Sequence, residues 1–134
     1  MKILVMGLSG AGKTTLATLL ESRLAYKYFN ADIIRKKYDD WDFSAEGRRR
    51  QTARMKFLAS EEKNCICDFI CPTEELRELF EPDFIIWMDT IKECKYEDTT
   101  ALFQPPEKYD IRISSFEYSI EDIVHQIKEF KHDK

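Results

Sequence analysis

Hydrophobic residues gather in short runs that alternate with longer segments of helical spacing. The run Lys2–Met6 is mostly apolar and ends at a glycine-rich turn, which is typical of a buried strand that leads into a helix. That helix is predicted over residues 13–26. Its leucines recur every three or four positions, so one face of the helix should pack on a sheet. These leucines are Leu16, Leu19, Leu20 and Leu24.

The same alternation continues toward the C-terminus. Further strands are predicted at residues 28–31, 65–70, 84–88 and 109–113. Helices are predicted at residues 44–61, 73–80, 90–96 and 120–130, with Ser44 and Thr73 as candidate N-cap residues. Five strands joined by helical crossovers predict an α/β fold, in which a mostly parallel five-stranded sheet has helices on both faces.

Length and composition fit one globular domain over residues 1–134, because a chain of this size buries about two-thirds of its unfolded surface. The net charge of −4 argues against a protein whose whole surface holds nucleic acid. No apolar run approaches the ~18 residues of a membrane-spanning helix. The N-terminus also lacks the length and cleavage pattern of a signal peptide, so the sequence predicts a cytoplasmic protein without membrane contact.

Cysteines could form a metal site, but their spacing does not favour one. Cys65 and Cys67 are followed by the lone Cys71 and Cys94, which differs from the paired C-x-x-C spacing of zinc sites. Cys65 and Cys67 alternate in an apolar run. They are therefore predicted to face one side of a buried strand as small, reduced hydrophobic residues.

Residues 7–14 match the phosphate-binding pattern G-x-x-x-x-G-K-[ST], between a predicted strand and a predicted helix. The glycines let backbone N–H groups turn toward phosphates, and the helix dipole adds to that anion site. Lys13 should reach the β- and γ-phosphates, and the Thr14 hydroxyl should coordinate Mg²⁺. The alternative is a turn that only joins strand to helix, but the match in this context favours ATP binding and a three-layer P-loop NTPase fold. The residues assigned to the nucleotide are Gly7, Leu8, Ser9, Gly10, Ala11, Gly12, Lys13, Thr14 and Thr15.

Three aspartates follow predicted strands, at the sheet edge where α/β folds bind ligands. Asp68 and Asp89 are candidates for the acidic residue near Mg²⁺, and Asp68 is favoured because its strand looks central. A carboxylate there could also cap a loop. Asp32 could orient an acceptor hydroxyl or hold Mg²⁺ through water. Equally, Asp32 could be the N-cap of the next helix.

Arginines form a second candidate site. Arg48 and Arg54 lie on either side of Gln51 at steps of three along a predicted helix, which places them on one face, and Arg35 comes from the preceding helix. Arginine suits bidentate contact with phosphate or sulfate, so the set predicts an anion clamp. The alternative is a solvated basic face, which is the interpretation given to Arg49 and Arg50.

These segments together resemble the adenylylsulfate kinase family over most of the chain. Residues 30–35 (NADIIR) are similar to D-G-D-N-x-R, residues 43–48 (FSAEGR) to F-S-x-x-D-R, and residues 70–72 (ICP) to I-S-P. Gln51 and Arg54 fall where the family has asparagine and arginine. Residues 88–90 (MDT) are similar to V-D-T, and residues 105–107 match P-P-E.

The resemblance implies transfer of the ATP γ-phosphate to the 3′-hydroxyl of adenosine 5′-phosphosulfate (APS), in the assimilation of sulfate. It implies that Asp32 and Ile70 contact the acceptor and that Phe43 and Phe103 stack on its adenine, although ordinary loop anchoring explains both aromatics equally well. The family's long basic lid after V-D-T is here reduced to about residues 95–104. Gly47 and Asn30 each stand at a position where the family has an aspartate.

The sequence therefore predicts an ATP- and Mg²⁺-dependent kinase with a small nucleotide as acceptor. One alternative is a kinase for another nucleotide or a nucleic-acid end, with the basic cluster at residues 48–56 as its footprint. A second alternative is a non-catalytic nucleotide-binding remnant, which the short lid favours. Homo-oligomers and the use of GTP remain open.

Overall fold

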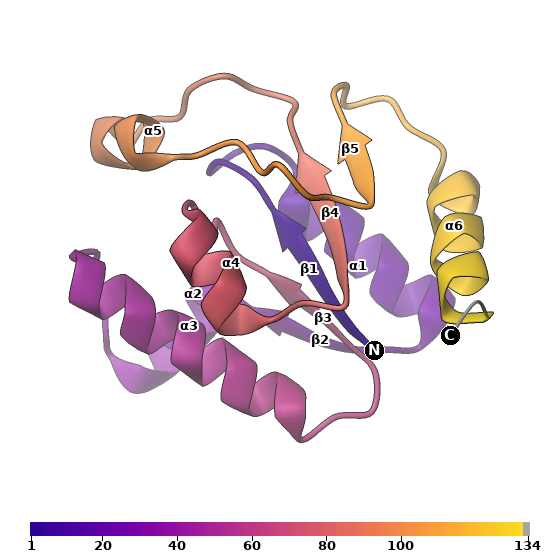
Figure 1. The fold of residues 1–134 in the computed structure, drawn as a ribbon, viewed down its shortest axis with the longest axis horizontal. Helices are drawn as coiled ribbons and strands as arrows, with labels where there is room; N and C mark the ends of the chain where they lie inside the picture. The colour runs from indigo at the N-terminus through magenta and orange to yellow at the C-terminus, as the bar shows by residue number, and fades with distance from the viewer. Residues whose placement is uncertain (133–134) are drawn as a thin grey trace.

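The computed structural model describes residues 1–132 and shows the expected three layers (Figure 1). Strands β1 (Lys2–Met6), β2 (Lys27–Asn30), β3 (Cys65–Asp68), β4 (Phe84–Met88) and β5 (Ile111–Ile113) form one sheet of order β2-β3-β1-β4-β5, and every neighbouring pair is parallel. The helices are α1 (Lys13–Leu24), α2 (Ala31–Tyr38), α3 (Ala45–Ser60), α4 (Glu74–Phe80), α5 (Glu97–Leu102) and α6 (Ile120–His132). The predicted fold class is confirmed.

Alternation along the strands creates two cores. Ile3 and Val5 point to the face covered by α1 and α6, where they join a buried cluster with Leu16 and Ile127. Leu4 and Met6 point to the opposite face, which is covered by α2, α3 and α4 (Figure 1). Because both faces are buried, the central strands read as continuous apolar runs rather than as alternating ones.

The cysteines contribute to the second core. Cys65 and Cys67 are buried on the same side of β3, in the cluster that contains Leu4, as predicted. All four cysteines are free thiols. Across residues 1–132, no group of three or more His, Cys, Asp or Glu side chains is placed to hold a metal. None of the helices in this part of the chain combines the length and the apolar character that a membrane crossing requires.

Helix starts follow the predicted caps, with one exception. The Ser44 and Thr73 side chains accept hydrogen bonds from the backbone N–H groups of Gly47 and Leu76. Asp32, however, neither closes a strand nor caps a helix. Strand β2 ends at Asn30, whose side chain accepts from Ile33 N at 3.0 Å and caps α2, so Asp32 lies in the first helical turn.

The predicted helix at residues 90–96 is wrong, because α5 begins only at Glu97. Side chains and backbone groups of residues 90–96 are instead bound to other segments. The Thr90 hydroxyl donates to Ala11 O at 2.7 Å, and the Cys94 backbone N–H donates to Thr100 Oγ1 at 3.0 Å. Glu97 and Asp98 supply negative charge to the first turn of α5, where the helix dipole favours it.

Gly47 is required by close packing at the start of α3. A Cβ atom at this position would lie 2.2 Å from Asp42 O and 2.5 Å from Asp42 Cγ. No side chain fits there without displacing the loop before α3.

We predict that Gly47→Ala lowers the free energy of unfolding by about 1–3 kcal/mol, as overpacked sites do. Urea denaturation monitored by circular dichroism measures this. The neighbouring variant Glu46→Ala, at an exposed position, is the control and should cost less than about 1 kcal/mol, because it loses only surface interactions with the helix dipole and with Arg49. Equal unfolding midpoints for Gly47→Ala and the wild type would contradict the packing argument.

Candidate active site

The phosphate-binding loop lies between β1 and α1, at the carboxyl edge of the sheet. Gly12 has φ 93° and is the N-cap of α1, and no side chain caps this helix. The first N–H groups of α1 are therefore left for an anion. Gly7 must be glycine for a different reason, since a Cβ would lie 2.6 Å from Met88 O. The loop thus fits the phosphates of a nucleotide.

Lys13 is buried beside this loop, where its Nζ donates to Leu8 O at 2.9 Å. Burial lowers the pKa of Lys13, while the carboxylates of Asp68 and Asp32 act in the opposite direction. The ammonium group is therefore a partly desolvated cation with two acidic neighbours. Such a group interacts strongly with phosphate oxygens, because little water screens it.

Asp68, at the end of β3, is the carboxylate that joins the phosphate loop. Thr14 Oγ1 donates to its Oδ2 at 2.8 Å, and Tyr28 OH and Asn30 Nδ2 donate to the same oxygen at 2.6 and 3.0 Å. Burial and the hydrogen bond to Asp68 raise the pKa of Tyr28 to about 12, so its hydroxyl remains a donor at neutral pH. Asp89, the other candidate, instead pairs with Arg112 and Lys92.

Thr14 and Asp68 fit a Mg²⁺ site of the kind found with ATP. Mg²⁺ prefers oxygen ligands and takes few of them from the protein, since phosphates and water supply the rest. The hydroxyl of Thr14 and the carboxylate of Asp68 lie within hydrogen-bond distance of each other beside the phosphate loop. This geometry favours Asp68 over Asp89 as the acidic residue of the site.

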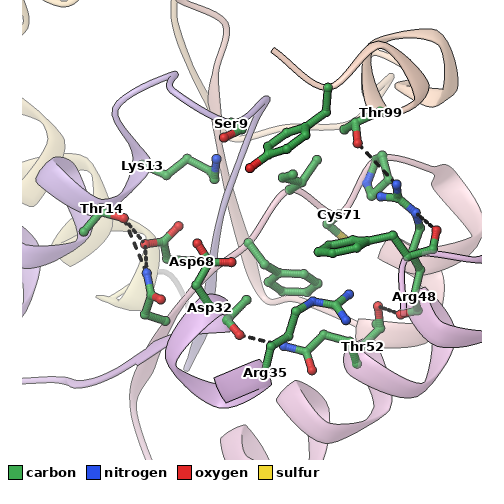
Figure 2. A pocket seen from close by; sticks show the side chains of 18 of the residues that line it. Ser9, Lys13, Thr14, Asp32, Arg35, Arg48, Thr52, Asp68, Cys71 and Thr99 are labelled. Carbon is green, nitrogen blue, oxygen red and sulfur yellow. Dashed lines mark hydrogen bonds between the residues drawn. The ribbon is translucent and has the colours of Figure 1, made fainter. Parts of the chain in front are cut away.

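A cleft of about 780 Å³ connects the phosphate loop to helices α2 and α3 (Figure 2). Lys13 and Thr14 lie on one side of the cleft and Arg35 and Arg48 on the other, with Asp32 between them. The sequence-predicted residues that line it are Ser9, Gly10, Gly12, Lys13, Thr14, Thr15, Asp32, Arg35, Phe43, Arg48, Gln51, Asp68 and Ile70. Donor-side and acceptor-side candidates therefore share one cavity.

Two buried arginines form the far wall. Arg35 and Arg48 carry their guanidinium carbons 4.3 and 5.6 Å from the centroid of the Phe43 ring. Arg48 is fixed by Nε donating to Phe43 O at 2.8 Å and by Nη2 donating to Thr99 Oγ1 at 3.2 Å. Burial lowers the pKa of both arginines, yet a guanidinium stays charged at neutral pH. The wall thus presents two partly desolvated cations to the cavity.

Some predicted residues lie elsewhere. The loop residues Gly7, Leu8 and Ala11 are buried and do not line the cleft. Arg54 donates to Gln51 Oε1 and to Asp40, and it is not part of the cavity wall. Phe103 is also outside the wall, because it packs on the second core with Arg77 over its ring. Gln51 lines the cleft while donating to Ala31 O.

The cleft also contains residues that sequence reasoning missed. Trp41 comes from the loop before α3, while Tyr96, Asp98 and Thr99 come from the α5 region. The only available signal was the pair of aromatics in polar surroundings, Trp41 and Tyr96, both of which are half exposed. Nothing in the local sequence ties α5 to Arg48, since that contact joins residues 51 positions apart.

Comparison with known proteins identifies relatives of this architecture. The family model described as adenylylsulphate kinase matches residues 1–114. No curated protein sequence matches the chain. An APS kinase of Mycobacterium tuberculosis, in complex with AMPPNP and APS, superposes with a TM-score of 0.74 at 21% identity, covering 98% of this chain and 97% of that one.

Two other solved structures are also similar. A hexameric APS kinase from Thiobacillus denitrificans has a TM-score of 0.68 at 27% identity, covering 98% of this chain but 28% of that longer one. A shikimate kinase from Aquifex aeolicus has a TM-score of 0.69 at 19% identity, covering 98% and 96%. The fold is thus that of small P-loop kinases. Because the family model spans most of its sequence, the chain belongs to the adenylylsulphate kinase family.

Proposed function

We propose that the protein transfers the γ-phosphate of ATP to the 3′-hydroxyl of adenosine 5′-phosphosulfate. The observation that carries this proposal is that the phosphate loop and the arginines Arg35 and Arg48 line opposite sides of the same cleft. Phosphoryl transfer needs two anionic substrates held with their reacting oxygens in line, and catalysis then depends mainly on position and charge.

On the donor side, the N–H groups at the start of α1 and the Lys13 ammonium would hold the ATP phosphates. Thr14 and Asp68 would hold the Mg²⁺, which neutralises charge on the β- and γ-phosphates. The Lys13 ammonium stabilises the charge that develops on the bridging oxygen as its bond to the γ-phosphorus breaks.

On the acceptor side, Arg35 and Arg48 would bind the phosphosulfate group, and Phe43 offers an aromatic ring beside them. Asp32 is an exposed residue that lines the cavity, and its carboxylate is close enough to Lys13 to act on the pKa of that lysine. Its carboxylate would accept a hydrogen bond from the attacking hydroxyl and take its proton as the new oxygen–phosphorus bond forms. The remaining wall, including Ile70, is mainly apolar.

The pairing of charges on α3 weighs against a nucleic-acid acceptor. Arg49 pairs with Glu75, Arg50 and Arg54 pair with Asp40, and Lys56 pairs with Glu81. Their charge is therefore locally neutralised rather than offered as a continuous basic surface.

The short lid is only weak support for a non-catalytic remnant. Helix α5 still contributes to the cleft, because Thr99 is buried against Arg48 and Asp98 lines the same wall. The acceptor side is thus covered although the lid is short.

An acceptor panel tests the proposal. The purified protein with MgATP is incubated separately with APS, AMP, adenosine, and oligonucleotides bearing free 5′- or 3′-hydroxyl ends, and ADP release is followed. Among these acceptors, we expect only APS to give ADP release above background. Release with an oligonucleotide would support the nucleic-acid alternative, and tight ATP binding without release under any condition would support the remnant.

A further inference from the structure

Two side chains of β2 reach the Asp68 carboxylate from the neighbouring strand. The register places Asn30 beside Asp68 and Tyr28 two residues earlier on the same face. Tyr28 OH lies 2.6 Å and Asn30 Nδ2 3.0 Å from Asp68 Oδ2, and Asn30 Nδ2 also lies 3.2 Å from the Tyr28 hydroxyl. With Thr14, three donors converge on one carboxylate oxygen. Such a set fixes the orientation of the carboxylate.

The second oxygen of Asp68 is left for another partner. Within residues 1–132, the hydrogen bonds to the Asp68 side chain all end on Oδ2. The carboxylate nevertheless lines the cleft beside Lys13. Oδ1 is therefore the oxygen that can face a cation held with the nucleotide phosphates.

Asn30 has a second task, which its amide combines with the first because it carries both an acceptor and a donor. Its Oδ1 accepts from Ile33 N and caps α2, the helix that carries Asp32 and Arg35. Its Nδ2 donates to Asp68 at the same time. An aspartate, which the resembling family has at this position, could cap the helix but could not donate to a second carboxylate. Asn30 thus connects α2, which carries Asp32 and Arg35, to Asp68 on the phosphate-loop side of the cleft.

We propose that Tyr28 and Asn30 are positioning residues that hold the Asp68 carboxylate beside Thr14 with Oδ1 directed to the Mg²⁺ of MgATP. The inference rests on the proposed function, because it assigns these residues to the same nucleotide site. A positioning role for these two residues differs from a purely structural role in one measurable respect. Loss of either donor weakens the Mg²⁺-dependent part of nucleotide binding and leaves the Mg²⁺-independent part unchanged.

The test is the affinity for AMPPNP, measured by calorimetry with Mg²⁺ and again with EDTA. Tyr28→Phe keeps the ring that packs on the first core and removes only the hydroxyl. We expect Tyr28→Phe to weaken binding about 10-fold with Mg²⁺, the scale seen when a partner of a metal ligand is removed, and less than about 2-fold with EDTA. Asn30→Ser keeps a capping oxygen but loses the amide Nδ2 that donates to Asp68, and it should show the same pattern.

Tyr26→Phe is the matched control. The Tyr26 hydroxyl contacts Lys131, away from the cleft, so this variant should bind as the wild type does under both conditions. Wild-type affinity of Tyr28→Phe with Mg²⁺, or equal losses with Mg²⁺ and with EDTA, would overturn the positioning role. A wild-type protein that gains no affinity from Mg²⁺ would overturn the Mg²⁺ site of the proposed function as well.

Discussion

Lys13→Ala is expected to lower the rate of phosphoryl transfer by at least ~10²-fold, the cost of losing one preorganised group that stabilises transition-state charge. The Lys13 ammonium is buried next to the phosphate loop and has Asp68 and Asp32 as charged neighbours. Among the residues that the structure describes, the groups that act on its charge are Asp68, Asp32 and Cys94, and none of them is a cation that could replace it. Single-turnover measurement of ADP formation at saturating MgATP reports the loss.

The fold should survive this substitution. Burial already lowers the pKa of Lys13, which means that the folded protein holds this charge at some cost. Its Nζ makes one hydrogen bond within the loop, to Leu8 O. Circular dichroism and thermal unfolding should therefore resemble those of the wild type. The control is Lys56→Ala on α3, which removes a surface ion pair with Glu81 and should leave the rate unchanged. Near-normal turnover in a folded Lys13→Ala protein would refute the kinase assignment.

Arg48→Ala is expected to raise the KM for APS about 10- to 150-fold, which corresponds to about 1.5–3 kcal/mol for a hydrogen bond to a charged group. The KM for ATP should change less than about 2-fold, because Arg48 lies across the cleft from the phosphate loop. Steady-state kinetics with each substrate varied in turn separates the two constants.

Arg49→Ala is the matched control for Arg48→Ala. Arg49 is the next residue on α3, but its side chain is half exposed and pairs with Glu75 outside the cleft. We expect nearly wild-type constants for both substrates. Arg48→Lys adds a further comparison, since it keeps the charge but loses the fork that contacts Phe43 O and Thr99. Equal effects of Arg48→Ala and Arg49→Ala would show that Arg48 does not bind the acceptor.

Local sequence signals were enough to predict the sheet and the position of the phosphate loop between a strand and a helix. The glycine pattern fixes the phosphate loop because its chemistry lies within eight consecutive residues. Continuous apolar runs located the central strands, since each is buried on both faces. The spacing of Arg48 and Gln51 on α3 likewise placed both in the cleft, because helical periodicity alone brings them to one face.

The arginine side of the cleft depends on contacts between distant residues, which no local pattern reports. Arg54 has the same spacing as Arg48, yet Asp40 of the preceding loop holds it away from the cleft. The family resemblance implies that Phe103 stacks on the acceptor, but Arg77 covers its ring and Tyr96 lines the cavity instead. Asn30 rather than Asp32 caps α2, because strand β2 ends one residue earlier than its apolar pattern suggests.

Transfer of labelled phosphate tests the central claim most directly. The protein is incubated with ATP labelled in the γ-position, Mg²⁺ and APS, and the nucleotide products are separated. The proposed function predicts that the label appears on the 3′-oxygen of APS, with one ADP formed for each phosphate transferred, and that Lys13→Ala slows the transfer at least ~10²-fold. Label found only in inorganic phosphate, or retained entirely in ATP while a known APS kinase reacts in the same mixture, would contradict it.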